Sequence, residues 1–251
     1  MKILFLGSGF TGRYFRYLYP HSIHSSRKKE FILKKGGGIV FDSNDPSTWK
    51  NASKTGAEGI IIAFPLTDIT EPEKLFEFLN GISRRILLIG TTSGFKKGLR
   101  EVDDYSPLDI ENPRSAAEEK FRQLGAAVLH SAGIYGESRN PIDWIRKGYI
   151  RSRSSVVNLV HAEDLARACS FILEDFPGNE RLVISDNHPY KWDEIINFAV
   201  RKGYISEPDI PSSGNGETRI VKPQRLFNMG FQLRHPSLYD ELHSLEMPDE
   251  L

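Results

Sequence analysis

The chain has few of the residues that would build a covalent or metal-stabilised scaffold. Its 251 residues include one cysteine, Cys169, so an intramolecular disulfide is excluded. One cysteine cannot form a thiolate zinc site, and the seven histidines show no HExxH spacing, so we expect no metal site. Cys169 lies in EDLARACSFILED on the apolar side of an expected helix, which indicates a core residue.

The chain also lacks an excess of either charge and any long apolar run. The 33 basic and 33 acidic residues give a formal net charge of zero, so no global field favours nucleic acid or an anionic membrane. In MKILFLGSG the apolar run stops at Gly7, before a signal-peptide core or a membrane span would be complete. We therefore expect a cytoplasmic protein that binds a small molecule and neither nucleic acid nor membrane.

Short apolar runs alternate with amphipathic segments along most of the chain. Unbroken apolar runs such as IIIAF and ILLIG are typical of strands that are buried on both faces. Strand and helix alternating at this pitch predict βαβ units and a parallel sheet covered on both sides. Residues 205–218, rich in Pro, Ser and Gly, are expected to form an exposed connector. Strands are expected near 2–7, 22–26, 38–42, 59–64, 85–90, 126–131 and 182–186, and helices near 11–19, 27–36, 71–81, 114–124, 142–148, 162–175 and 191–203.

The segment GSGFTG, residues 7–12, matches GxGxxG directly after an expected strand and at the start of an expected helix. In this setting the first glycine permits a tight turn, the second lets the backbone approach a pyrophosphate, and the third allows close helix packing. The helix N-terminus adds unpaired amides and a positive dipole end. A glycine turn of purely structural use is the alternative. The residues expected to hold the phosphates are Gly7, Ser8, Gly9, Phe10, Thr11 and Gly12.

The end of the second expected strand indicates which dinucleotide is bound. An acidic residue usually accepts the ribose 2′-hydroxyl of NAD at this place, whereas this chain has Ser25, Ser26, Arg27 and Lys28. Hydroxyls can donate hydrogen bonds to a 2′-phosphate, and a guanidinium can bind a 2′-phosphate bidentately. The pattern therefore favours NADP(H) over NAD(H), the alternative being a solvated, basic start of the next helix.

Two further strand ends are expected to touch the cofactor. Asp42 ends GIVFD, where its carboxylate could accept a hydrogen bond from an adenine amino group, and Ser43 follows it. A turn or helix-capping role for Asp42 is a comparable alternative. Phe64 and Pro65 end the fourth strand, where a stretch of backbone usually runs along the cofactor, although Pro65 can also simply end the strand.

Three later segments resemble the extended short-chain dehydrogenase/reductase family, which contains NAD(P)-dependent sugar-nucleotide epimerases and dehydratases. AGIYG (132–136) resembles the loop after the sixth strand of that family, and NLVHAEDLARA (158–168) resembles its NxVHxxDLA motif. The segment KPQRLFNMGFQLRHPSLYDEL (222–242) is similar to its C-terminal tail. The resemblance implies a Rossmann-like, doubly wound parallel sheet of the α/β class with a small C-terminal substrate lobe.

The resemblance also implies a set of active-site positions, some of which are changed here. Active relatives carry a Ser or Thr after the fifth strand; Thr91 takes that position, with Thr92 and Ser93 as near alternatives. They also carry a Tyr-x-x-x-Lys pair, and the alignment of RSAAE with that helix places Arg114 at the lysine and Ile110 at the tyrosine. Isoleucine cannot transfer a proton, and the pKa of arginine is too high for it to act as a base, although Arg114 can hold a ribose or phosphate.

The remaining expected site residues come from the same resemblance. A substitute proton donor could come from Tyr135 or Tyr105, and Asn158 and His161 could reach a ligand. For His161, bracing a loop is the ordinary alternative, and for arginines it is surface ion pairing. The residues expected to line the cofactor are Ala132, Gly133 and Ile134, and those expected to line the substrate cleft are Arg139, His161 and Arg225.

The resemblance divides the chain into a dinucleotide-binding core, about 1–135 and 156–186, and a substrate lobe, about 137–155 and 187–251. Two hypotheses stay open at this point. The first is an NADP(H)-dependent oxidoreductase or epimerase in which Thr91 polarises a substrate oxygen and a non-standard group moves the proton. The second is an inactive NADP(H)-binding sensor or scaffold. Related folds often dimerise through two helices beside the fifth strand, so a homodimer is one expected state.

Overall fold

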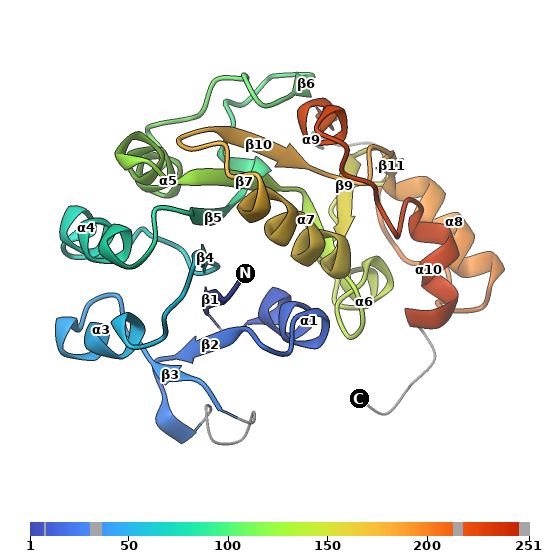
Figure 1. Cartoon of the computed structure of the whole chain (residues 1–251). Coiled ribbons are helices and arrows are strands. Elements are labelled where there is room, and N and C mark those ends of the chain that lie inside the picture. Colours follow the sequence, from blue (N-terminus) through green and yellow to red (C-terminus); the bar gives the residue numbers. More distant parts are fainter. Residues whose placement is uncertain (8, 31–36, 213–217, 246–251) are drawn as a thin grey trace.

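A seven-stranded sheet forms the centre of the molecule in the computed structural model, which describes residues 1–7, 9–30, 37–212 and 218–245 (Figure 1). The strand order is β10-β7-β5-β4-β1-β2-β3, and every neighbouring pair is parallel. The α/β class and the doubly wound parallel sheet expected from the sequence are confirmed. The strands are β1 (Ile3–Leu6), β2 (Ile23–Ser26), β3 (Ile39–Val40), β4 (Gly59–Ile62), β5 (Ile86–Thr91), β7 (Ala127–Ser131) and β10 (Arg181–Ile184).

Helices cover both faces of this sheet, and each face has its own apolar core (Figure 1). On one face, Phe5 and Ile61 of the strands pack with Phe15 of α1 and with the buried side of α7. On the other, Leu4 and Ile60 pack beneath α3, α4 and α5. The continuous apolar runs of β1 and β4 are thus explained by burial on both sides. These helices are α1 (Phe10–Leu18), α3 (Pro46–Ser53), α4 (Pro72–Ile82), α5 (Pro113–Leu124) and α7 (Ala162–Glu174).

The order of the strands fixes where a ligand can bind. The chain runs from β1 outward to β2 and β3, and then returns to place β4 on the opposite side of β1. The loops after β1 and β4 therefore leave in opposite directions, and a crevice opens at the carboxyl ends of these two strands. Ile3 to Leu6 pair in register with Gly59 to Ile62, so both strands end at the same level.

Smaller elements extend the fold beyond the main sheet. The strands β8 (Gly133–Tyr135), β9 (Val156–His161) and β11 (Pro189–Lys191) form a three-stranded sheet, and β6 (Glu101–Val102) pairs with β12 (Ile220–Val221). A third apolar core joins this small sheet to three helices, α6 (Pro141–Arg146), α8 (Trp192–Arg201) and α10 (Leu238–Leu245) (Figure 1).

The short helix α9 (Gln224–Asn228) packs differently from its neighbours in sequence. Its Leu226, together with Phe231, is buried in the core under the main sheet rather than in the third core. The expected helix at 27–36 lies mostly outside the described residues, as does part of the expected connector. No helix among the described residues is long and apolar enough to cross a membrane.

Candidate functional site

The glycines after β1 have three different local roles. Gly7 has φ +116°, a conformation that favours glycine, and it makes the turn out of the strand. A Cβ on Gly12 would lie 2.8 Å from the Gly7 carbonyl oxygen and 3.2 Å from the Phe5 ring, so the third glycine lets α1 pack onto β1. A Cβ on Gly9 would meet nothing within 4 Å, because Gly9 faces open space. Ser8 lies outside the described residues.

Gly9 is also the N-cap of α1, and among the residues that the structure describes no side chain caps this helix end. Its first turn carries no acidic residue, so the first amides and the positive end of the helix dipole face the same open space as Gly9. An anion such as a pyrophosphate fits this arrangement, because the backbone can approach it closely and unpaired N–H groups can bind it. The expectation drawn from GSGFTG thus has the local geometry that it requires.

Two cavities meet at this glycine turn. The first, here called the β2 cavity, has a volume of about 630 Å³ and lies along the ends of β2, β3 and β4. All the expected cofactor residues of these strand ends that the structure describes line it. They are Gly7, Gly9, Ser25, Ser26, Arg27, Lys28, Phe41, Asp42, Ser43, Asn44, Ala63, Phe64, Pro65, Asp68 and Ile69.

The β2 cavity is lined by both basic and acidic side chains. Arg27 and Lys28 are exposed beside the Ser26 hydroxyl, which accepts the Lys28 amide at 3.2 Å. Asp42 lines the same cavity, and its Oδ1 accepts the Asn44 amide at 3.0 Å, so one of its oxygens holds a turn. The N-cap of α3 is instead Asp45, whose side chain accepts the Ser47 amide.

The second cavity, here called the β5 cavity, has a volume of about 480 Å³ and lies at the ends of β5, β7 and β9. It shares Gly9 and Ala63 with the β2 cavity, so the two cavities adjoin at the crevice between β1 and β4, and together they are here called the groove. Its lining is Gly9, Phe10, Thr11, Gly12, Ala63, Ile89, Gly90, Thr91, Thr92, Ser93, Arg114, Ser131, Ala132, Gly133, Ile134, Arg139, Val156, Val157, Asn158 and Arg219.

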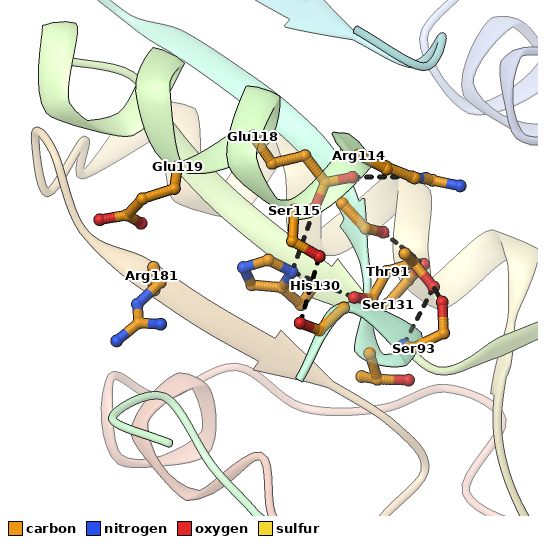
Figure 2. A network of polar contacts seen from close by, with 12 residues as sticks. Thr91, Ser93, Arg114, Ser115, Glu118, Glu119, His130, Ser131 and Arg181 are labelled. Atoms are coloured by element: carbon orange, nitrogen blue, oxygen red, sulfur yellow. Dashed lines mark hydrogen bonds and ion pairs between the residues drawn. The ribbon is translucent and has the colours of Figure 1, made fainter. Parts of the chain in front are cut away.

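Thr91 ends β5 and turns the chain into a short 3₁₀ helix, Thr92–Gly94. The Thr91 hydroxyl lies 3.0 Å from the Ser93 hydroxyl and accepts the Ser93 amide at 3.3 Å. Figure 2 shows these two side chains together with Ser131 from the neighbouring strand β7. Because hydroxyls both donate and accept, this group can hold a ligand oxygen or an amide.

Behind Thr91, a buried polar network connects α5 to the sheet (Figure 2). Glu118 is 2% exposed and accepts a 2.8 Å hydrogen bond from Arg114 Nε, and its other oxygen lies 3.5 Å from His130 Nδ1. His130 Nδ1 is also 3.2 Å from the Thr91 carbonyl oxygen. A carbonyl can only accept, so Nδ1 carries the hydrogen of a neutral imidazole. A Cβ on Gly90 would lie 2.8 Å from Glu118 Oε2, so only glycine leaves room for this network.

Burial controls the charge states of this network. It lowers the pKa of His130 to about 4, so the imidazole is neutral at pH 7. Burial also raises the pKa of Glu118, and its hydrogen bond and charge interaction with Arg114 oppose that rise. The short contact with Arg114 favours an ionised Glu118, and hence an ion pair at the edge of the β5 cavity.

Two polar residues of the β5 cavity are not predicted by the sequence as ligand-binding residues. Arg219 is 7% exposed and donates to the carbonyl oxygens of Thr92 at 2.9 Å and Lys96 at 3.1 Å. It precedes β12 and reaches the cavity through a long-range contact, for which the sequence holds no local signal. Ser131 ends β7 and donates to the Gly90 carbonyl at 3.1 Å. Its position at a strand end, like that of Thr91, is the signal that could have found it.

Three of the predicted residues lie away from the groove. Tyr135 is fully buried in the third core, and burial raises its pKa far above that of an ordinary tyrosine. The preceding residue, Ile134, lines the cavity, and successive strand residues point to opposite faces. Tyr135 therefore has neither the placement nor the acidity of a proton donor to this cavity. Arg225 forms a 2.8 Å ion pair with Glu180, which agrees with surface ion pairing rather than with ligand binding.

His161, the third of them, has a structural role. It is the N-cap of α7, and its Nδ1 accepts the Glu163 amide at 3.3 Å. His161, Glu163 and His235 place ligand atoms within 4.8 Å of one another, a spacing that could hold a metal ion. Glu163 is already paired with His235 at 3.1 Å and with Arg234 at 2.7 Å, however, so its charge is compensated by the protein.

Neither Ile110 nor Tyr105 lines the β5 cavity. Ile110 is 65% exposed in the turn before α5, and Tyr105 is 74% exposed with its ring 6.0 Å from the Arg225 guanidinium. Asn158 does line this cavity, but its side chain bonds the backbone of Arg219 and Val221. Neither Ile110 nor Tyr105 is therefore placed to act on a ligand in this cavity.

Arg139 lies where a cleft residue is expected. It lines the β5 cavity, and its guanidinium lies 5.3 Å from the centre of the Phe10 ring. The side chain comes from the loop after β8, so a cation reaches the groove from three residues beyond the AGIYG segment, although the tyrosine of that segment points away.

Comparison with solved structures supports the fold. The chain is similar to a conserved protein of unknown function from Silicibacter pomeroyi, with 22% identity, 98% of each chain covered and a TM-score of 0.75. It is similar to the dTDP-glucose 4,6-dehydratase of Bacillus anthracis in complex with NAD, with 14% identity, 98% and 96% coverage and a TM-score of 0.75. It is also similar to the UDP-glucose 4-epimerase of Thermus thermophilus in complex with NAD, with 14% identity, 98% coverage of each chain and a TM-score of 0.72.

No protein-family model and no curated protein sequence matches the chain. At 14–22% identity these structural similarities establish the fold. The chain therefore has the fold of the NAD-dependent epimerases and dehydratases that the sequence motifs resemble.

Proposed function

We propose that this protein binds NADP(H) along the groove and acts as an oxidoreductase of the epimerase/dehydratase type. The observation that carries the proposal is the meeting of two cavities at Gly9. An extended dinucleotide needs an anion site between two pockets, and the uncapped start of α1 lies between the β2 and β5 cavities. The β2 cavity would take the adenosine half and the β5 cavity the nicotinamide half.

The preference for NADP(H) is supported by the basic side chains of the β2 cavity. Ser26, Arg27 and Lys28 line it, and positions 23–29 of the sequence hold no Asp or Glu. An adenosine 2′-phosphate there would meet two cations and a hydroxyl, whereas the single ribose hydroxyl of NAD(H) would lack its usual carboxylate partner. Asp42, which also lines this cavity, is suited to an adenine amino group.

The catalytic part of the proposal is supported by the Thr91 hydroxyl and by Arg114. Thr91 can hydrogen-bond a substrate oxygen, and Arg114 can donate to a ribose or to the substrate from the place where relatives carry a lysine. The described lining of the β5 cavity contains no tyrosine, lysine, histidine or carboxylate. This favours a second candidate, an NADP(H)-binding sensor without turnover, because no lining residue has an ordinary pKa near neutrality.

The cofactor proposal is tested by titrating the purified protein with NADPH and with NADH, following nicotinamide fluorescence. We expect NADPH to bind more tightly than NADH, and Arg27→Ala to weaken NADPH binding about tenfold or more, because a charged hydrogen bond contributes about 1.5–3 kcal/mol. NADH binding should change little. The matched control is Arg84→Ala, an exposed arginine before the amino end of β5. If neither cofactor binds the wild type, both functional candidates are wrong.

A turnover assay then separates the two candidates. NADPH oxidation is followed with carbonyl compounds and nucleotide sugars as acceptors, in the wild type and in Thr91→Val. An oxidoreductase should lose turnover in Thr91→Val while it retains NADPH binding, because valine keeps the shape of threonine without the hydroxyl. Tight NADPH binding without oxidation by any acceptor would support the sensor.

A further inference from the structure

The charged side chains that line the β5 cavity are all cations. Arg114, Arg139 and Arg219 reach it from α5, from the loop after β8 and from the segment before β12. The other polar side chains are the hydroxyls of Thr11, Thr91, Thr92, Ser93 and Ser131 and the amide of Asn158. No carboxylate belongs to the described lining. A cavity of about 480 Å³ with this lining has a positive potential and many hydrogen-bond donors.

Arg114 lines the cavity and is held at one of its three guanidinium nitrogens. Glu118 accepts from Nε, the inner nitrogen of the guanidinium, at 2.8 Å. Among the described residues no bond is made by the two terminal nitrogens, and the side chain is 38% exposed. In Figure 2 these terminal nitrogens lie on the far side of the guanidinium from Glu118. The buried carboxylate therefore fixes the arginine and leaves its fork of N–H donors for a ligand.

Arg139 and Arg219 approach from other elements. The Arg139 guanidinium lies over the Phe10 ring at 5.3 Å from its centre, a contact that holds the group without using its N–H donors. Arg219 is held by the carbonyl oxygens of Thr92 and Lys96, which places a buried cation beside the Thr91 turn. Guanidinium groups bind carboxylate and phosphate oxygens bidentately.

The negative charges of the cofactor do not account for these cations. In the proposed mode its pyrophosphate lies at the start of α1 and its 2′-phosphate lies by Arg27 and Lys28. The nicotinamide ring carries a positive charge when it is oxidised, and nearby guanidinium groups repel it. A negative charge in the same cavity would remove this repulsion.

We propose that the molecule sharing the β5 cavity with the nicotinamide is a small anion that carries a carboxylate or a phosphate, recognised by Arg114, Arg139 and Arg219. This inference rests on the proposed function for the identity of the cofactor. The anion and NADP⁺ should each tighten the binding of the other by the same factor, as linkage requires.

The test uses malonate and inorganic phosphate as the two anionic probes and malonamide as the neutral analogue of malonate. Their binding is measured by titration calorimetry at constant ionic strength, with the protein alone and with the protein saturated with NADP⁺. We expect one of the anions to bind, more tightly with NADP⁺ present, and malonamide to give no binding. The anion that binds more tightly identifies the group as carboxylate or phosphate.

Three variants locate the site. Arg114→Met should weaken anion binding about tenfold or more, the loss expected for one charged hydrogen bond. Because Arg114→Met also leaves Glu118 without its partner, a second variant is made at Arg139, which is exposed. Arg139→Met should weaken anion binding as well. Arg84→Met, far from the cavity, should leave anion binding unchanged.

The outcomes separate this inference from the proposed function. Two results would contradict the proposed anion site while NADP⁺ still binds and the cofactor proposal stands. In the first, neither anion binds better than malonamide. In the second, the anions bind all three variants with equal affinity. If NADP⁺ does not bind, the proposed function falls, while anion binding to the protein alone that is lost in Arg114→Met and Arg139→Met would still support the cationic site.

Discussion

Arg114 lies at the position where the family resemblance implies a lysine, and its partner Glu118 is buried one helical turn further along α5. The family resemblance implies Arg114, Thr91 and Arg139 as site residues, because each lies in a segment that matches one of the family's site segments. All three line the β5 cavity. Arg219 could not be predicted, because it reaches the cavity by bonding Thr92 and Lys96 across more than 120 positions of the chain.

Tyr135 shows a limit of motif-based prediction at the same scale. Its segment, AGIYG, does line the groove, but the direction of each side chain depends on the strand that the segment forms. Motif similarity places a segment near a ligand, whereas the two-residue alternation of β8 decides that Ile134 faces the cavity and Tyr135 the third core.

His130 gives a prediction at the residue scale. Its folded-state pKa of about 4 lies below the ordinary value of 6.5. The unfolded chain therefore takes up a proton as the pH falls below 6.5 while the folded chain does not. The contribution of His130 to the free energy of unfolding is therefore fully present above pH 6.5 and is lost as the pH falls toward 4. Between pH 7 and pH 5 this group should lower the free energy of unfolding by about 2 kcal/mol.

The measurement is urea unfolding at pH 7 and pH 5 for the wild type and for His130→Asn, which cannot take up the proton. The decrease between the two pH values should be smaller by about 2 kcal/mol in His130→Asn than in the wild type. The control is His21→Asn, at an exposed histidine. Between pH 7 and pH 5 the free energy of unfolding of this variant should decrease as much as that of the wild type. An equal decrease in wild type and His130→Asn would show that His130 is not buried in its neutral form.

At the scale of elements, apolar spacing predicts long periodic segments well and short ones poorly. The helices α4, α5, α7 and α8 and the strands β1, β4, β5 and β7 all lie where this spacing places them. The helix α3 is not predicted, because only Trp49 and Ala52 of its residues are buried. Its start, with Asp45 as N-cap and Pro46 at the first helical position, carries a recognisable signal. The two-residue strands β6 and β12 pair across the chain and have no local signal.

The start of α1 gives a prediction at the element scale, because two of its glycines should respond differently to the same change. Gly12→Ala places a Cβ 2.8 Å from the Gly7 carbonyl oxygen, and this clash should lower the free energy of unfolding by about 2 kcal/mol, outweighing the better helix propensity of alanine. Gly9→Ala places a Cβ in open space and should cost at most about 1 kcal/mol as a poorer N-cap.

NADPH affinity should rank the two variants in the reverse order of their stability, because Gly9→Ala is expected to be the more stable variant and the weaker binder. The Cβ of Gly9→Ala occupies the space proposed for the pyrophosphate, so NADPH affinity should fall at least about tenfold although the fold is retained. The measurements are urea unfolding and NADPH fluorescence titration of both variants. Wild-type affinity in Gly9→Ala would mean that no ligand approaches the backbone at this glycine.

At the scale of the whole molecule, the strand order explains why the groove lies where it does. Successive strands are added in one direction from β1 to β3 and in the other from β4 onward, and this opens a crevice at the carboxyl ends of β1 and β4. Both cavities share Gly9 and Ala63 at this crevice. The sequence predicts this sheet, because βαβ alternation and buried strands constrain its topology. It does not predict that α9 packs under the main sheet, since this depends on long-range contacts of Leu226.

The measurement that tests the central claim most directly is a crystal structure of the protein with NADPH. The account predicts one NADPH along the groove, with its 2′-phosphate beside Arg27 and Lys28, its pyrophosphate at the start of α1 and its nicotinamide in the β5 cavity. Density for the cofactor elsewhere, or none at saturating concentration in crystals that leave the groove open, would contradict the account.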